Sequence, residues 1–163
     1  MLLQRLRKIR ESAPRVYWLV WWGTLVNRLG GFVVPLLTIY LTTQRHASVA
    51  EAGAIVSFFG AGQVGASVVG GQLTDRVGRR ATMLVSLFGG AIAMALLGGA
   101  RGLTEITVLV TVVGFVGELY RPAVSAVVTD VVPPAQRLYA YGLLYWAVNL
   151  GFAFAGSVGG LIA

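Results

Sequence analysis

The 163-residue sequence contains no cysteine and one histidine, and few of its residues carry a charge. Without cysteine, the chain has no disulfide bonds, no thiolate metal ligands and no cysteine nucleophile. His46 alone cannot form a histidine-rich metal centre. Charged residues make up 12% of the chain, about half of their usual share in soluble domains, whereas 56% of the residues are hydrophobic. We therefore expect no metal ion and no cofactor, and we exclude a soluble globular enzyme.

Long apolar runs separated by short polar breaks fill most of the chain. A helix needs about 20 apolar residues to cross the hydrocarbon core of a bilayer, which is about 30 Å thick. Helices also satisfy their backbone hydrogen bonds within each segment, as lipid requires. We therefore predict an all-α, polytopic transmembrane helix bundle with five spans, which cover approximately residues 16–41, 50–71, 81–100, 105–128 and 138–163.

The basic residues gather on one side of these spans. Nine lie in the amino-terminal tail and in the loops after the second and fourth spans, whereas Arg45 and Arg101 lie on the other side. Because cytoplasmic loops are enriched in lysine and arginine, we expect a multi-pass protein of the cell (inner or plasma) membrane with a cytoplasmic amino terminus. Leucines and isoleucine alternate with basic residues over 2–9, which favours an interfacial helix on anionic lipid. No aromatic or loop motif accompanies these charges, so nucleic acid is not an expected partner.

The segment GQLTDRVGRR, residues 71–80, is the most specific feature of the sequence. It resembles the signature G-x-L-a-D-R-x-G-R-[KR] between helices two and three of major facilitator superfamily (MFS) transporters. The matching residues are Gly71, Leu73, Asp75, Arg76, Gly78, Arg79 and Arg80. The resemblance extends over all five spans by count and orientation, and it implies a conformational latch that holds two halves together in the outward-facing state. A plain positive-inside loop would explain the three arginines but would not explain Asp75 and both glycines.

Two weaker resemblances follow. Residues 129–137 look like the family's cytoplasmic loop between helices four and five, and 149–160 resemble a fifth-helix glycine pattern associated with antiporters. Ala155–Gly156 stand where that pattern has a glycine–proline pair. Because the sequence stops at Ala163 inside an apolar run, we expect a partial amino-terminal half, without the sixth helix and the carboxy-terminal half.

Ionisable residues inside the spans are candidates for function, because a charge at mid-membrane costs about 2.5–3.5 kcal/mol on insertion scales. Arg28 lies near the middle of the first span, beside Asn27. Glu118 and Arg121 lie three residues apart in the fourth span, so they share a helix face and can pair. We take all four residues as substrate or proton cavity candidates, with Glu118 as the carboxylate available for proton coupling. A structural Glu118–Arg121 pair without a transport role is the alternative.

Small residues recur every four positions in the second span, which favours close helix packing. They form two stripes, Gly53, Ser57, Ala61 and Gly65, and Gly62, Ala66 and Gly70. Pro35 and Pro122 predict helix kinks.

The resemblance implies a secondary transporter that moves a small-molecule substrate across the lipid bilayer by alternating access between two six-helix halves. A drug or metabolite exporter, coupled to protons as an efflux antiporter, is the expected subclass. The alternative is a membrane scaffold or interaction protein that keeps transporter ancestry without transport. An intramembrane enzyme is disfavoured, because no span carries a serine–histidine, paired-aspartate or HExxH arrangement.

Overall fold

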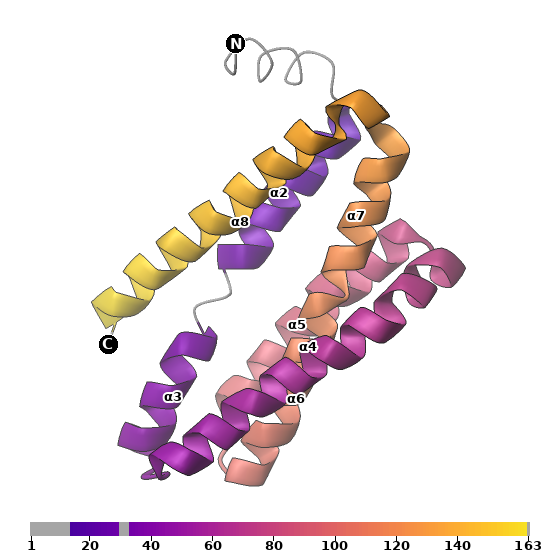
Figure 1. Ribbon diagram of the computed structural model, residues 1–163. Coiled ribbons are helices and arrows are strands. Elements are labelled where there is room, and N and C mark those ends of the chain that lie inside the picture. Colours follow the sequence, from indigo (N-terminus) through magenta and orange to yellow (C-terminus); the bar gives the residue numbers. More distant parts are fainter. Residues whose placement is uncertain (1–13, 30–32, 163) are drawn as a thin grey trace. The chain divides into compact units, whose positions relative to one another are not determined.

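The computed structural model describes residues 14–29 and 33–162, and every regular element in these ranges is a helix (Figure 1). The helices are α2 (Arg15–Leu29), α3 (Val33–Gln44), α4 (Val49–Val77), α5 (Arg79–Gly99), α6 (Leu103–Glu118), α7 (Tyr120–Val131) and α8 (Pro134–Ile162). The predicted all-α class is therefore confirmed. The predicted interfacial helix over 2–9 lies outside the described residues.

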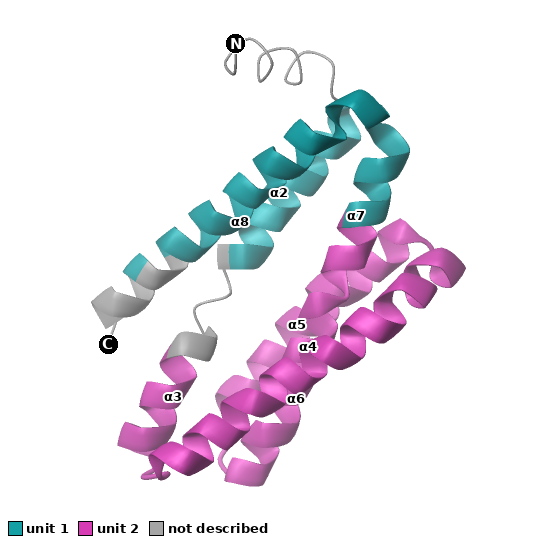
Figure 2. Cartoon of the chain, viewed as in Figure 1, with its two compact units in different colours: residues 1–33, 125–163 teal, residues 34–124 magenta. Residues whose placement is uncertain are grey.

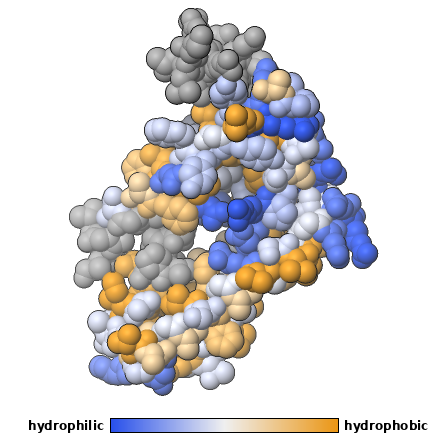
Figure 3. All heavy atoms as spheres, viewed as in Figure 1, coloured by the Kyte–Doolittle hydropathy of each residue, from blue (hydrophilic) through white to orange (hydrophobic). Residues whose placement is uncertain are grey.

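Among the described residues, three helical stretches are long and apolar enough to cross a membrane, judged by length and composition. They are Val49–Val77, Arg79–Gly99 and Leu103–Val131, and the last of these comprises α6 and α7. Large apolar side chains such as Phe88, Ile92 and Leu96 are exposed along α5. Figure 3 shows apolar side chains on the visible surface of the molecule. Exposed apolar surface of this kind suits contact with lipid.

The helices differ most from the predicted spans in two places. The predicted first span contains two helices, α2 and α3, on either side of residues 30–32, which are not described. The predicted second span ends at residue 71, whereas α4 continues to Val77. Hydropathy marks where a chain leaves the apolar layer, and a helix can continue beyond that point through polar residues. The segment 71–80 is therefore almost entirely helical and is not an open loop.

The chain divides into two compact units (Figure 2). Unit 1 comprises residues 1–33 and 125–163, and unit 2 comprises residues 34–124.

In unit 1, α2 and α8 pack side by side and run in the same direction. The Tyr17 hydroxyl donates a hydrogen bond to the Ala140 carbonyl oxygen at 2.8 Å, and Trp21 Nε1 donates to the Leu143 carbonyl at 2.8 Å. Further along both helices, Gly151 lies against Arg28. Residues later in α2 contact residues later in α8, as expected of two spans that enter a membrane from the same side.

In unit 2, α4 and α6 also run in the same direction and pack through glycine. A Cβ atom on Gly62 would overlap the carbonyl oxygen of Thr111 in α6, and one on Gly70 would lie 2.8 Å from Cγ of Pro122 in α7. Of the two predicted packing stripes, Gly62, Ala66 and Gly70 are buried, whereas Gly53, Ser57 and Ala61 are exposed. Close packing through the stripe Gly62, Ala66 and Gly70 is confirmed, and it fixes which face of α4 meets α6 and α7.

Candidate functional site

Gly78 is the joint between α4 and α5 and the one non-helical residue in the signature segment. Its backbone angles are φ 95° and ψ 152°, a combination that essentially only glycine adopts. The amide of Gly78 donates to the Thr74 carbonyl at 3.1 Å, and its own carbonyl accepts the amide of Thr82 at 3.1 Å. The chain therefore closes one helix and opens the next within a single residue.

Two buried threonines hold this joint from either side. The Thr74 hydroxyl donates to the Gly70 carbonyl at 2.7 Å, and the Thr82 hydroxyl donates to the Gly78 carbonyl at 3.0 Å. Both side chains are almost completely buried, so each hydroxyl has the hydrogen bond that a buried polar group needs.

Three of the four charges around the joint lie at the unfavourable ends of the helix dipoles. Asp75 lies in the last turn of α4, while Arg79 and Arg80 open α5. A helix dipole favours anions at the amino terminus and cations at the carboxyl terminus, by about 0.3–1 kcal/mol each. Of the four charges, Arg76 alone stands at the favourable end. Helix α5 also begins without a side-chain cap, so Asp75 does not cap it. Local helix stability therefore does not explain this arrangement.

The stretch Leu103–Val131 is interrupted between α6 and α7, near its middle. Leu119 is the break, and Pro122 lies three residues beyond it. Proline has no amide hydrogen, and its ring clashes with the carbonyl of the residue four positions earlier, which here is Glu118. Pro122 is therefore the cause of the interruption, and Glu118 is the last residue of α6.

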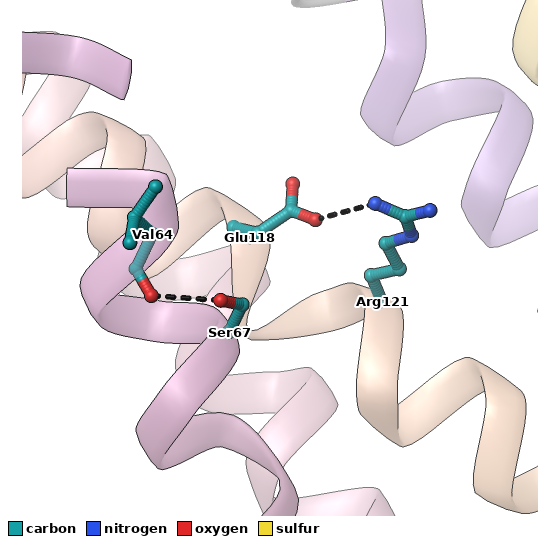
Figure 4. A network of polar contacts seen from close by, with 4 residues as sticks. All are labelled: Val64, Ser67, Glu118 and Arg121. Carbon is teal, nitrogen blue, oxygen red and sulfur yellow. Dashed lines mark hydrogen bonds and ion pairs between the residues drawn. The ribbon is translucent and has the colours of Figure 1, made fainter. Parts of the chain in front are cut away.

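Glu118 and Arg121 form an ion pair across this break (Figure 4), so their predicted pairing is confirmed. Arg121 Nη1 lies 3.3 Å from Glu118 Oε1. The Glu118 side chain is 12% exposed, whereas that of Arg121 is 77% exposed. The Ser67 hydroxyl, drawn in the same figure, donates to the Val64 carbonyl of its own helix at 2.7 Å. The Glu118 side chain is therefore mostly buried, while the Arg121 guanidinium remains accessible.

Arg28 lies in unit 1, in the last turn of α2. Its stem packs on α8, where a Cβ on Gly151 would lie 2.5 Å from Arg28 Cβ. Its guanidinium carbon lies 5.7 Å from the centre of the Phe152 ring, within the range of a cation–π contact. Arg28 Nε is buried and has no hydrogen-bond partner among the described residues.

The four cavity candidates thus fall into two groups. Arg28 and Asn27 belong to unit 1, and Asn27 is half-buried. Glu118 and Arg121 belong to unit 2 and are brought together there. Sequence reasoning missed Phe152, because its partner Arg28 lies far away along the chain and no periodic signal links them. Among the described residues, no three histidine, aspartate or glutamate side chains gather as they would around a metal ion.

Comparisons with known proteins show the family of the chain. Residues 20–163 match the family model described as Major Facilitator Superfamily. The chain is 31% identical to the uncharacterized MFS-type transporter YqjV of Bacillus subtilis (strain 168), over 94% of this chain and 38% of YqjV. It is 30% identical to the uncharacterized MFS-type transporter YttB of the same organism, over 92% of this chain and 38% of YttB. The quinolone resistance protein NorA of Staphylococcus aureus (strain MRSA252) is 23% identical, over 82% of this chain and 34% of NorA. The chain therefore spans little more than a third of these relatives.

Proposed function

Because the chain belongs to the Major Facilitator Superfamily, a family of multi-pass membrane transporters and not of enzymes, we propose that the complete protein moves a small solute by alternating access. The observation that carries this proposal is the family match over residues 20–163. The greater length of the relatives supports a second half beyond this chain. The excess of basic residues in the tail and in two loops supports a cytoplasmic amino terminus in the cell membrane.

We further propose that the protein is an exporter coupled to protons, and that Glu118 carries the proton. The other described carboxylates lie close to the ends of the apolar stretches Val49–Val77 and Leu103–Val131, whereas Glu118 lies near the middle of the second of these. A carboxylate at that depth is costly unless it has a function or a partner. The similarity to a quinolone resistance protein supports export of a drug-like molecule.

The Glu118–Arg121 ion pair offers a simple way to exchange a proton for a substrate. A proton and a cationic or hydrogen-donating group of the substrate compete for the same Glu118 carboxylate. Because both cannot occupy it together, binding of one releases the other, which is the requirement for an antiporter. Arg121 neutralises the carboxylate when neither is bound, and its exposed guanidinium is free to move aside.

We propose Asp75 and the signature residues around Gly78 as the cytoplasmic latch between the two halves. The observation that supports this role is the position of Asp75 at the unfavourable end of the α4 dipole. A residue that costs local stability without a structural benefit suggests a function elsewhere in the cycle.

The test is proton exchange by the complete protein in proteoliposomes loaded with a pH-sensitive dye, with a fluorescent quinolone as the probe. We expect the quinolone to drive proton movement, and Glu118→Gln to abolish it. Glu105→Gln is the matched control, because Glu105 lies in the first turn of the same helix and accepts a hydrogen bond from the Arg101 amide at 3.0 Å. Proton movement that persists in Glu118→Gln would place the proton site elsewhere. Wild-type protein that shows no solute-dependent flux with any probe would favour the scaffold alternative.

A further inference from the structure

Ser86 of α5 makes a hydrogen bond that the proposed function does not use. Its hydroxyl donates to the Val116 carbonyl oxygen at 2.7 Å and approaches the Gly117 carbonyl at 3.3 Å. Both acceptors belong to α6, directly before Glu118. Ser86 is 1% exposed, so this bond lies in the packed interior of unit 2.

The two carbonyls need a donor from outside their own helix. The last four carbonyls of an α-helix have no amide partner within that helix, and Val116 and Gly117 are among these in α6. Pro122 prevents the chain from continuing here as one regular helix, since its ring clashes with the Glu118 carbonyl. In a lipid-surrounded protein an unsatisfied carbonyl costs several kcal/mol. The Ser86 hydroxyl supplies the missing donor.

Close packing of α5 on α6 makes the bond geometrically accessible. Gly89 lies one turn beyond Ser86, and a Cβ on Gly89 would lie 2.9 Å from Val116 Cγ1. The absence of a side chain at Gly89 therefore lets α5 approach α6 at the residue whose carbonyl Ser86 binds. The hydroxyl and the glycine together fix the end of α6.

We propose that Ser86 is a positioning residue for the Glu118–Arg121 pair. By satisfying the carbonyls of Val116 and Gly117, it sets the direction in which α6 ends, and with it the place of the Glu118 carboxylate. This inference rests on the proposed proton role of Glu118. The contribution of Ser86 to transport is indirect, because its hydroxyl binds the backbone and not the substrate or the proton.

The experiment compares Ser86→Ala with the wild type in the complete protein, in nanodiscs and in proteoliposomes. We expect amide hydrogen exchange over residues 116–121 to become about threefold to tenfold faster, as the loss of one hydrogen bond implies. We also expect a shift in the pH at which quinolone-driven proton movement is half-maximal, because the Glu118 carboxylate is no longer held against Arg121. Ser57→Ala is the matched control, since the Ser57 hydroxyl donates to the Gly53 carbonyl of its own helix at 2.8 Å and is exposed. It should change neither readout.

Ser86→Cys provides a second variant should the alanine variant fail to accumulate, because the thiol is similar in size and only a weak donor. Unchanged amide exchange over 116–121 in both variants overturns the inference. Faster amide exchange together with an unshifted pH profile of proton movement also overturns the inference, because the Ser86 bond is then merely structural. In either case the effect of Glu118→Gln is measured separately, so failure of Ser86 is distinguished from failure of the proton role of Glu118.

Discussion

Gly62 of α4 and Thr111 of α6 lie in backbone-to-backbone contact. A Cβ on Gly62 would overlap the Thr111 carbonyl oxygen and would lie 2.9 Å from the Phe115 amide nitrogen. The relation is reciprocal, since a Cβ on Gly114 would overlap the Phe59 carbonyl oxygen. Glycine is required at both places, because backbone atoms cannot move aside as the end of a flexible side chain can. In a membrane, where apolar side chains gain little by leaving lipid, such close packing is a main source of helix association.

Gly62→Ala is therefore expected to destabilise the fold by about 1–3 kcal/mol, the usual cost of overpacking. The measurement is the unfolding of the purified protein in detergent. Gly53→Ala is the matched control on the same helix, because nothing lies within 4 Å of the Cβ position there. The control should be neutral, or stabilising by up to about 1 kcal/mol, since alanine is the better helix former. Equal losses in the two variants would contradict the α4–α6 contact.

Gly78→Ala is expected to cost about 1–3 kcal/mol, although space is available for the added methyl group. The cost comes from the backbone, because φ at this residue is 95°. Gly71→Ala is the comparison, since Gly71 is helical and its Cβ position is equally open. A thermal melt of both variants checks the prediction. If Gly78→Ala melts with the wild type, the joint does not need its left-handed geometry.

Asp75→Asn is expected to abolish or sharply reduce transport without lowering thermal stability. Removal of a negative charge from the last turn of α4 relieves an unfavourable dipole interaction, so stability should stay constant or rise slightly. The measurement is quinolone efflux at matched expression, and Asp75→Glu, which keeps the charge, is the companion variant. Efflux at the wild-type rate in Asp75→Asn would remove the latch assignment.

Arg28→Met is expected to leave stability unchanged or improved, because it removes a buried Nε without a hydrogen-bond partner among the described residues. If Arg28 receives an anionic or polar group of the substrate, the affinity for substrates that carry such a group should fall about tenfold or more.

Arg45→Met provides the opposite case. Arg45 donates to the Tyr40 hydroxyl at 2.7 Å and to the Ala100 carbonyl at 2.9 Å, so its loss should lower stability and leave substrate affinity unchanged. Binding titrations and melts on both variants separate the two roles. Unaltered affinity in Arg28→Met would assign Arg28 to packing on α8 alone.

The sequence was sufficient to predict the helices and the charge pair, because both depend on local spacing. Hydropathy located the three apolar helical stretches found among the described residues, and a three-residue separation brought Glu118 to Arg121. Pro122 predicted a kink in the fourth span, and the helix is interrupted there. The sequence predicts a loop at the signature segment, and this prediction is wrong, because the polar residues mark the end of the apolar stretch and not the end of the helix. Helix α4 continues through Asp75 to Val77.

Long-range contacts were beyond sequence reasoning. The two small-residue stripes of α4 have the same periodicity, and only packing decides that Gly62 faces α6 while Gly53 faces outward. Ser86 was overlooked because its acceptors lie about 30 residues away and serine in an apolar helix has many ordinary explanations. The contact of Arg28 with Phe152 joins two helices that no pattern connects.

The connection at Gly78 also limits how α4 and α5 can move. A single residue offers only two soft torsion angles, and successive Cα atoms remain 3.8 Å apart whatever those angles are. The facing ends of the two helices therefore cannot separate, and any change in the angle between them is a rotation about one point. A conformational cycle that displaces the carboxyl end of α4 must carry the start of α5 with it. A pair of labels on Thr74 and Thr82 would therefore report almost no change in distance, while labels at the far ends of both helices would report the full change in angle.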